Sequence, residues 1–368
     1  MKRVQAQSPS NIAIVKYMGK TSAEINLPAN ASLSLTLNHL ASIAQIEQTK
    51  TLESGEVKLN HALPVGEGLG LKPPVSKLSE AGQERFVRHF KRCETKMDTA
   101  WFESFGLKRL ALDHSKGVEI RCASRFPAGA GIASSASSFS ALTLATAAYF
   151  ASDRTEFEKA WEQVEFKKAV AKLSREGSGS SCRSLMGPWV EWQPTVQDES
   201  ESEDTVTEIP SVLPELTDFV ILVDQKEKKV SSSQAHERVL SSPLWNQRVN
   251  RATERLERIK KALSSNDRQT LAWEVWRESW EMHSLFHTAS KPFTYWQPAT
   301  LSVLEWLSGE LERNDPPMVT LDAGPNIHCL VPSSEASQWR ERIAAQFPQL
   351  SVLEDRQGSG ASLIQWQS

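Results

Sequence analysis

Two stretches rich in glycine and serine have the composition of phosphate-binding loops. PAGAGIASS covers residues 127–135, and REGSGSSCRS covers residues 175–184. Glycine lets a backbone approach a ligand closely, and the free N–H groups at the start of a helix attract anions. Either stretch taken alone is also consistent with a tightly packed helix start or a surface turn. Two of them in one half of the chain favour a phosphate site.

Hydroxyl and cationic side chains within these stretches suit the oxygens of a phosphate group. Ser134 and Ser135 fall in the first turn of a helix predicted over residues 134–150, where they could bind a phosphate oxygen or a magnesium ion. The second stretch adds Arg175 and Arg183, whose guanidinium groups can form bidentate hydrogen bonds with phosphate. We therefore expect both stretches to contribute to phosphate binding.

A carboxylate at the end of a strand is the third candidate for chemistry. Asp322 lies in the apolar run MVTLDAG at residues 318–324, just before a Gly-Pro turn. A carboxylate in that position could act on a substrate held in a cleft. An aspartate before glycine is also a common turn residue, so the position alone does not decide between the two.

Three other motifs are weaker. The GKT at residues 19–21 resembles the end of a Walker A loop, but that loop needs a glycine where Ile14 stands. His283 and His287 favour packing or surface roles over a zinc site, because no third ligand is evident. The basic run KEKK at residues 226–229 is predicted to be a solvated strand end.

The composition argues against several classes of protein. A formal net charge of −3 gives no general affinity for nucleic acid. The four cysteines lack CxxC spacing, which argues against a disulfide framework and favours the reducing cytoplasm. No apolar run reaches the length of about 18 residues that a membrane span needs, and the first residues lack the apolar core of a signal peptide.

The pattern of apolar residues predicts the elements that must position these side chains. The expected strands cover residues 11–17, 31–37, 41–48, 117–123, 185–192, 218–224, 318–324 and 327–332, with a short one near the C-terminus. The expected helices cover residues 79–105, 134–150, 155–174, 231–241, 243–264, 266–286, 298–314 and 334–346. Because strands and helices mix without regular βα alternation, we expect an α+β fold.

A change of composition near residue 195 predicts a domain boundary. The acidic segment QDESESEDTVTE at residues 197–208 is expected to be a solvated loop. We therefore expect one domain over residues 1–192 and a second, carrying Asp322, over residues 193–368.

Several segments, taken in order along the chain, resemble the GHMP kinase superfamily and, within it, the mevalonate diphosphate decarboxylase family. They are SNIAIVKYMGK at 10–20, FPAGAGIASSAS at 126–137, GSGSSCRSLMG at 177–187 and DAGPN at 322–326. The resemblance implies a lobe similar to a ribosomal S5 domain, a ferredoxin-like second lobe and an active site in the cleft between them. It also implies ATP and Mg²⁺, and conversion of (R)-5-diphosphomevalonate to isopentenyl diphosphate, ADP, phosphate and CO₂. A homodimer is expected, with no nucleic acid or membrane partner.

The resemblance also implies three groups of site residues. The catalytic residues would be Asp322, Lys16 and Arg183. The substrate contacts would be Tyr17, Lys20, Arg85, Ser178, Ser180 and Asn11. The contacts to ATP phosphates would be Gly129, Ala130, Gly131, Ala133, Ser134 and Ser135, with Ser135 also a candidate Mg²⁺ ligand. Asp322 would lie beside the 3-hydroxyl of the substrate as a general base or an orienting group, while Lys16 would offset negative charge on the transferring phosphoryl group.

Departures from the family pattern leave alternatives open. Met18 stands where the family usually has tryptophan, and Thr21 and Ser22 stand where it has arginine and aspartate. A relative acting on mevalonate or its monophosphate, a kinase that stops after phosphorylation, and a non-catalytic ligand-binding relative are therefore the alternatives. The presence of both Lys16 and Asp322 favours full decarboxylation.

Overall fold

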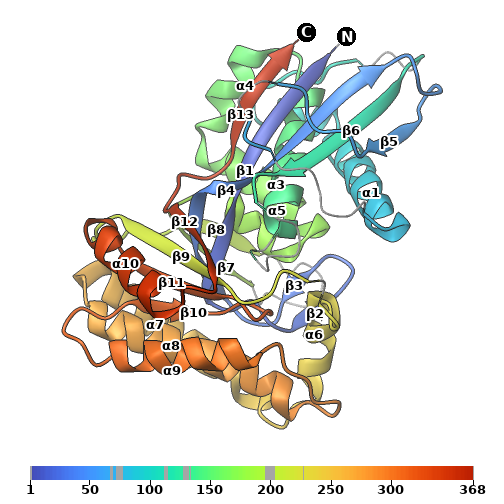
Figure 1. The fold of residues 1–368 in the computed structure, drawn as a ribbon. Coiled ribbons are helices and arrows are strands. Elements are labelled where there is room, and N and C mark those ends of the chain that lie inside the picture. The colour runs from blue at the N-terminus through green and yellow to red at the C-terminus, as the bar shows by residue number, and fades with distance from the viewer. Residues whose placement is uncertain are drawn as a thin grey trace.

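The computed structural model describes residues 2–66, 69–71, 78–111, 115–126, 132, 134–194, 204–226 and 228–367. These residues form two lobes, each built on a β-sheet with helices packed against it (Figure 1). The helices and strands mix without regular alternation, so the predicted α+β class is confirmed. No helix in the described part of the chain combines the length and the apolar content needed to cross a lipid bilayer.

The first lobe contains a mixed sheet of seven strands, in the order β13-β1-β4-β6-β5, with β7 pairing with β4 and β8 pairing with β7. Its strands are β1 (Arg3–Val15), β4 (Ser32–Thr49), β5 (Val57–Asn60), β6 (Gly117–Ser124), β7 (Trp189–Gln193), β8 (Thr205–Glu208) and β13 (Ser362–Gln367). A separate two-stranded hairpin, β2 (Lys20–Ser22) and β3 (Leu27–Pro28), follows β1. Only β5 and β6 pair in parallel; the other described ladders are antiparallel.

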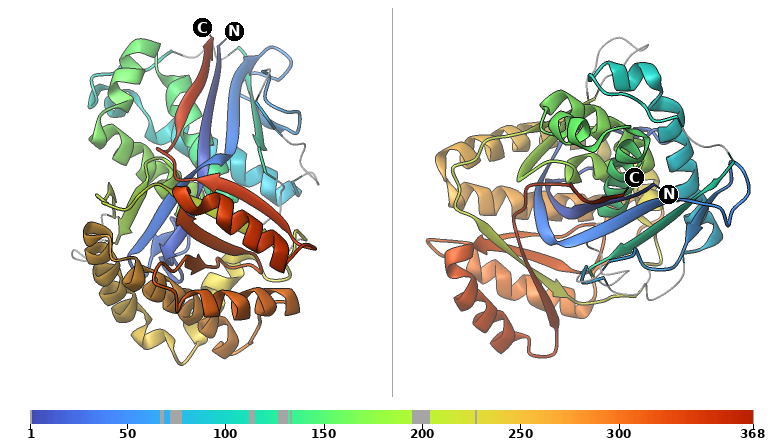
Figure 2. Two further views of the ribbon diagram at one scale, coloured as in Figure 1. Left: turned by 60° about the vertical axis from the view of Figure 1, so that its left-hand side comes forward. Right: turned by 90° about the horizontal axis from the view of Figure 1, so that it is seen from above.

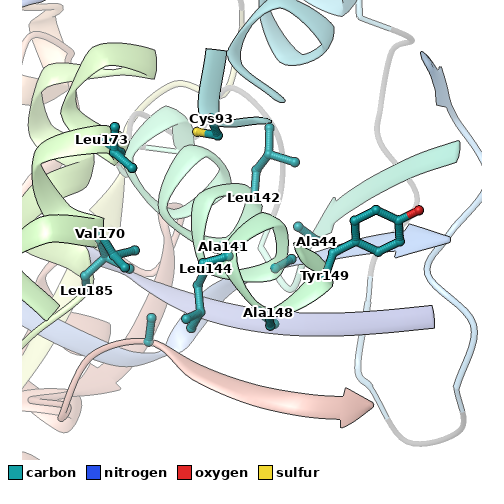
Figure 3. Packing of buried hydrophobic residues seen from close by; sticks show 14 of the residues in the cluster. Ala44, Cys93, Ala141, Leu142, Leu144, Ala148, Tyr149, Val170, Leu173 and Leu185 are labelled. Atoms are coloured by element: carbon teal, nitrogen blue, oxygen red, sulfur yellow. The ribbon is translucent and has the colours of Figure 1, made fainter. Parts of the chain in front are cut away.

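The helices of the first lobe pack on one another and on this sheet around a central helix, α3. They are α1 (Glu80–Lys96), α2 (Thr99–Glu103), α3 (Ser134–Phe150), α4 (Arg154–Trp161), α5 (Val164–Gly177) and the short 3₁₀ helix η1 (Gly179–Ser184). Every α3 residue from Ala136 onwards is buried, and side chains of α1 and α5 surround it (Figure 3). Alanine and serine make this possible, because small side chains let helix and sheet approach; Ser140 Oγ lies 2.5 Å from Ser8 Oγ on β1.

The second lobe has a four-stranded antiparallel sheet in the order β10-β11-β9-β12. Its strands are β9 (Leu216–Leu222), β10 (Met318–Thr320), β11 (Ile327–Pro332) and β12 (Ser351–Arg356). Its helices are α6 (Ser232–Arg238), α7 (Arg248–Ser265), α8 (Arg268–Thr288), α9 (Pro298–Glu310) and α10 (Ala336–Gln346), with 3₁₀ turns η2 (Val239–Ser241), η3 (Trp245–Gln247) and η4 (Ser333–Glu335). Strands β10 and β11 pair as an antiparallel hairpin, with Thr320 opposite His328.

An apolar cluster joins the two lobes. Ile12 and Ile14 of β1 and Leu33 and Leu35 of β4 are buried in one cluster with Leu256 of α7, among others. The ends of the two longest strands of the first sheet therefore pack against the helices of the second lobe. This shared core fixes how residues at the end of β1 face the second lobe.

Several predicted boundaries are wrong for identifiable reasons. The helix expected over 79–105 ends at Lys96, because Asp98 caps a new helix by accepting a hydrogen bond from the Trp101 N–H. The strands expected over 31–37 and 41–48 form the single strand β4. Between them, the Asp355 carboxylate accepts hydrogen bonds from the N–H groups of His39 and Leu40, which keeps the chain extended where pairing with β1 shifts register.

The region predicted to be the second domain, residues 193–368, includes two strands that belong to the sheet of the first lobe. Residues 205–208, expected to be loop, form β8, and β13 pairs with β1 beside the N-terminus (Figures 1 and 2). The rest of the acidic segment, up to residue 203, lies outside the described residues. The domain boundary between residues 192 and 193 stays a prediction. Two strands that follow it in the sequence, β8 and β13, belong to the sheet of the first lobe.

Candidate active site

A cavity of about 410 Å³ lies between the two lobes. It is lined by every predicted site residue that the structure describes: Asn11, Lys16, Tyr17, Lys20, Arg85, Ser134, Ser135, Ser178, Ser180, Arg183 and Asp322. Four predicted ATP contacts, Gly129, Ala130, Gly131 and Ala133, lie outside the described residues. The described end of the first small-residue stretch, Ser134 and Ser135, therefore shares one cavity with Asp322. The chemical roles of these residues stay predictions.

One ion pair joins the lobes inside this cavity. Lys16 follows the end of β1, Asp322 follows β10, and Lys16 Nζ donates to Asp322 Oδ1 at 2.9 Å. The Lys16 side chain is only 1% exposed, whereas Asp322 keeps 24% of its side-chain surface exposed. A cation and a carboxylate from different sheets thus meet at one point of the cavity.

Each partner changes the proton affinity of the other. Desolvation would raise the pKa of Asp322, but the Lys16 cation, with smaller contributions from His328 and Lys228, lowers this pKa below its ordinary value. Burial lowers the pKa of Lys16, and the charge of Asp322 offsets only part of that effect. Asp322 is therefore ionised at neutral pH, which suits a group that accepts a hydrogen bond.

Arg183 is a buried guanidinium whose described hydrogen-bond partners are neutral. It lies in η1 and donates to Ser32 Oγ at 2.7 Å and to Ser34 Oγ at 3.1 Å. Among the described residues it forms no ion pair, and burial lowers its pKa. A buried cation without a direct ion pair is costly, and Asp322 offsets its charge only from a distance, so this arrangement is suited to an anionic ligand in the cavity.

The two small-residue stretches come together at this cavity. Ser178 Oγ donates to Ser135 Oγ at 3.2 Å, which connects the start of η1 to the first turn of α3. Asn11 holds the other side of η1, donating to Ser180 O at 3.1 Å and to Ser184 Oγ at 2.8 Å. A Cβ atom at position 179 would lie 2.5 Å from the Tyr17 ring, so glycine is required there. Small residues are thus needed for packing as well as for ligand access.

One end of the cavity is basic. Lys20 Nζ donates to Asn26 Oδ1 at 2.8 Å, and Arg85 Nη2 donates to Gly177 O at 3.3 Å. Within the described residues neither cation forms an ion pair, and burial lowers the pKa of both. An adjoining cavity of about 560 Å³ shares both cations and adds Arg88 and Arg92, whose charges are partly offset by the carboxylates of Glu24, Glu176 and Glu237 in the same wall. This end is suited to a group with more than one negative charge.

Sequence reasoning missed several residues that line the cavity from the second lobe: Lys226, Lys228, Ser231, Ser232, Ser233, His236, Met282 and Ala323. The prediction of a solvated strand end was wrong for Lys228, which is largely buried and donates to Ala323 O beside Asp322. The run KEKK carried a basic signal, but nothing local showed that one lysine turns inwards.

The two histidines four residues apart both pack against the ring of Trp296. The His283 ring stacks on Trp296 with centroids 4.9 Å apart, and His287 contacts the same ring edge-on. The described residues contain no group of three or more His, Cys, Asp or Glu side chains that could hold a metal.

Magnesium delivered with a nucleotide is nevertheless compatible with these residues. Mg²⁺ bound to phosphates keeps several waters and needs only one or two protein oxygens. The Ser135 hydroxyl, at the cavity wall and within 3.2 Å of Ser178 Oγ, can supply one. The chain thus suits a metal carried by the nucleotide better than one held by protein ligands alone.

A two-lobed α+β architecture, with serine-rich loops and a lysine–aspartate pair facing one cleft, defines a GHMP-kinase-like protein. A family model described as the diphosphomevalonate decarboxylase-like N-terminal domain matches residues 8–204. Another, described as the mevalonate 5-diphosphate decarboxylase C-terminal domain, matches residues 219–365. The chain therefore belongs to the mevalonate diphosphate decarboxylase family, and the resemblance inferred from the motifs is confirmed.

Individual relatives agree with this assignment. A diphosphomevalonate decarboxylase from Gibberella zeae is 28% identical over 330 residues, covering 88% of this chain and 79% of the relative. The crystal structure of a mevalonate diphosphate decarboxylase from Legionella pneumophila is 32% identical, covers 95% of this chain and 100% of its own, and has a TM-score of 0.74. A structure of MDDEF in complex with MVAPP, AMPPCP and magnesium is 24% identical and covers 99% of each chain. Its TM-score of 0.78 shows that the two proteins share a fold.

Proposed function

We propose that this protein catalyses the ATP-dependent decarboxylation of (R)-5-diphosphomevalonate to isopentenyl diphosphate, ADP, phosphate and CO₂. The observation that carries the proposal is the 2.9 Å Lys16–Asp322 pair, contributed by two lobes to the cavity that Ser134, Ser135 and Arg183 also line. Relatives that cover nearly the whole chain carry the name of this activity.

The reaction needs a good leaving group on the carbon that receives electrons. The substrate carboxylate lies β to a tertiary alcohol, and no ketone is present to accept the electrons of the breaking C–C bond. Transfer of the γ-phosphoryl group from ATP to the 3-oxygen releases ADP and replaces hydroxide with phosphate as the leaving group. The C–C bond to the carboxylate then breaks, its electrons form the alkene, the C3–O bond breaks, and CO₂ and phosphate depart.

Asp322 and Lys16 suit the first of these steps. An ionised Asp322 would accept a hydrogen bond from the 3-hydroxyl and aim its oxygen at the γ-phosphorus. Its lowered pKa supports orientation of the hydroxyl over long-lived retention of the proton. Lys16 would offset the negative charge that develops on the transferring phosphoryl oxygens.

The remaining cationic and hydroxyl groups suit the anionic ends of the two ligands. Arg183, with neutral partners only, would bind an anionic group of the substrate near the reacting centre. Lys20 and Arg85, together with the hydroxyl groups of Tyr17 and Ser178, would hold the diphosphate at the basic end. Asn11 and Ser180 would hold η1 beside the reacting groups.

The nucleotide would bind on the side of the first phosphate loop. The loop from Gly129 to Ser135 would contact the ATP phosphates, with Ser134 and Ser135 at its described end. Mg²⁺ bound with ATP, and touching the Ser135 hydroxyl, would neutralise charge on the β- and γ-phosphates. A homodimer in the cytoplasm completes the proposal, and light scattering of the purified protein tests the dimer.

One assay tests the function against its alternatives. Purified enzyme is given ATP and Mg²⁺ with diphosphomevalonate, phosphomevalonate or mevalonate in parallel, and ADP and CO₂ are measured separately. We expect equal amounts of ADP and CO₂, with the highest kcat/KM for the diphosphate. ADP without CO₂ would identify a kinase, and a preference for a less phosphorylated substrate would contradict the proposed specificity.

A further inference from the structure

One face of helix α8 holds the main chains that carry both members of the Lys16–Asp322 pair. Glu278 Oε1 accepts the Lys16 N–H at 2.9 Å. Ser279 Oγ accepts the Leu321 N–H at 3.0 Å, and His283 Nε2 lies 3.2 Å from the Asp322 carbonyl oxygen. The two residues come from different lobes, yet they are attached to side chains within six positions of one helix.

The attachment of Lys16 uses buried charges. β1 ends at Val15, so Lys16 lies just past the paired strand, and Glu278 accepts its N–H while Arg248 Nη2 donates to its carbonyl oxygen at 3.2 Å. Glu278 and Arg248 are 0% exposed and form an ion pair with each other. Arg255 Nη1 also donates to Glu278 Oε2, at 2.5 Å.

Stability alone does not account for this buried pair. Desolvating two charges costs about as much as their attraction returns, so apolar side chains of similar volume would stabilise the helix pair at least as well. Apolar side chains, however, cannot hold the N–H and the C=O groups of Lys16 in fixed directions, because they form no hydrogen bonds. The geometry therefore points to a role in fixing the position of Lys16.

His283 supports the same conclusion through its unpaired nitrogen. Because its partner is a carbonyl oxygen, Nε2 carries the proton and donates. The other ring nitrogen, Nδ1, is buried without a partner among the described residues. Burial lowers the pKa of His283 to about 3, so the ring is neutral. A buried unsatisfied nitrogen lowers stability, so a phenylalanine ring would pack there at smaller cost but would have no N–H to donate.

We propose that α8 is the common support of the catalytic pair, with Glu278 and His283 as positioning residues that set the distance between Lys16 and Asp322. This inference rests on the proposed function. Neither side chain lines the interlobe cavity, so each acts through the main chain of another residue. The step they serve is phosphoryl transfer, in which a misplacement of about 1 Å can reduce the rate roughly 100-fold.

The first test separates activity from stability at position 283. His283→Phe removes the donor and keeps a ring against Trp296, while His283→Gln keeps an amide N–H donor. We expect His283→Phe to lower kcat by about tenfold or more, with KM for both substrates within about twofold and a melting temperature no lower than that of the wild type. His283→Gln should recover most of the kcat. An unchanged kcat in His283→Phe, or a loss that only follows a fall in melting temperature, would contradict the proposal.

The second test uses a matched pair of charge removals on the same helix. Glu274→Met and Glu278→Met each replace one buried carboxylate that contacts Arg255 with an unbranched side chain that cannot accept a strong hydrogen bond, but only Glu278 contacts Lys16. We expect both variants to lose thermal stability, with kcat reduced about tenfold or more in Glu278→Met and within about twofold in Glu274→Met. Equal kcat losses in the two variants would show a structural role only. If Glu278→Met does not fold, the comparison of the two variants at position 283 remains the test.

A crystal structure of His283→Phe tests the inference without any activity measurement. We expect the Lys16 Nζ to Asp322 Oδ1 distance to increase beyond hydrogen-bonding range, to about 3.5 Å or more. An unchanged distance would overturn the inference even if the wild type decarboxylates diphosphomevalonate. A wild type inactive on all three substrates would instead overturn the proposed function, with the distance still a test of positioning.

Discussion

The two walls of the interlobe cavity are built from opposite kinds of residue. The first-lobe wall, at the start of α3 and in η1, is built largely of small residues joined by hydrogen bonds between neutral groups, such as Ser178 to Ser135, with Arg183 as the one cation of η1. Behind the second-lobe wall lie α7 and α8, joined by buried ion pairs, such as Arg248 with Glu278. Small residues leave room and free donors for phosphates. Buried charges instead fix a few main-chain atoms in place, as Glu278 does for Lys16.

Loss of the second-lobe carboxylate should have the largest effect. Asp322→Asn keeps the size of the side chain but weakens its pairing with Lys16 and its acceptance of the substrate hydroxyl hydrogen bond. We expect kcat to fall by about 10³-fold, while ATP binding, which depends on the first-lobe wall, changes little. Steady-state kinetics and calorimetric titration with an ATP analogue measure the two effects. Unchanged turnover would contradict the assignment of Asp322.

Removal of Lys16 should reduce activity less and shift its pH dependence. Lys16→Met leaves the desolvation that raises the pKa of Asp322 less well offset, so this pKa should rise above its lowered wild-type value. Because the ionised carboxylate is the active form, the acid limb of kcat should move to higher pH, with kcat at its optimum reduced about 100-fold.

A kcat profile from about pH 3 to pH 9, which includes the range below the ordinary pKa of an aspartate, measures the shift in Lys16→Met. Lys226→Met is the control, since Lys226 lines the same cavity but forms no described ion pair with Asp322. Its acid limb should stay where it is in the wild type. If the acid limb moved equally in both variants, the total positive charge of the cavity, and not the ion pair with Lys16, would set the pKa of Asp322.

Substitution at the basic end of the cavity should change binding more than turnover. Arg85→Ala is expected to raise KM for diphosphomevalonate by about tenfold, a moderate effect because the arginine is only partly buried and solvent screens its charge. KM for phosphomevalonate should rise less, and kcat should change little. Lys91→Ala, on the same helix but outside the interlobe cavity, is the control. Equal KM changes for the two substrates would remove Arg85 from diphosphate recognition.

Adding one methyl group to the first-lobe wall should have the smallest effect. In Gly179→Ala the new Cβ would lie 2.5 Å from the Tyr17 ring, so the ring must move. We expect a loss of about 1–3 kcal/mol in the free energy of unfolding, measured with urea, and a higher KM. Gly309→Ala, on α9 with nothing within 4 Å of the new Cβ, should gain up to about 1 kcal/mol. A Gly179→Ala variant as stable as the wild type would show that this wall tolerates larger residues.

Much of the fold followed from local patterns, and the failures occurred where distant residues intervene. Alternation predicted most strands, and helical periodicity predicted most helices, because each element buries one face. The break predicted between residues 37 and 41 does not occur, since Asp355, more than 300 positions away, accepts the N–H groups that a turn would have exposed. The short strand β8 was missed because four residues beside an acidic segment show little periodicity.

Residue types alone indicated two small-residue stretches for phosphates and a carboxylate, Asp322, at the end of a strand, and the resemblance to a known family added cations for a diphosphate and Lys16 as a candidate reacting group. Only the tertiary structure decided that Lys16 and Asp322 meet at 2.9 Å, that Lys228 turns inwards, and that α8 holds both main chains. The physical reason is that side-chain chemistry is a property of each residue. Its position depends on contacts between segments hundreds of residues apart, and local periodicity carries no record of them.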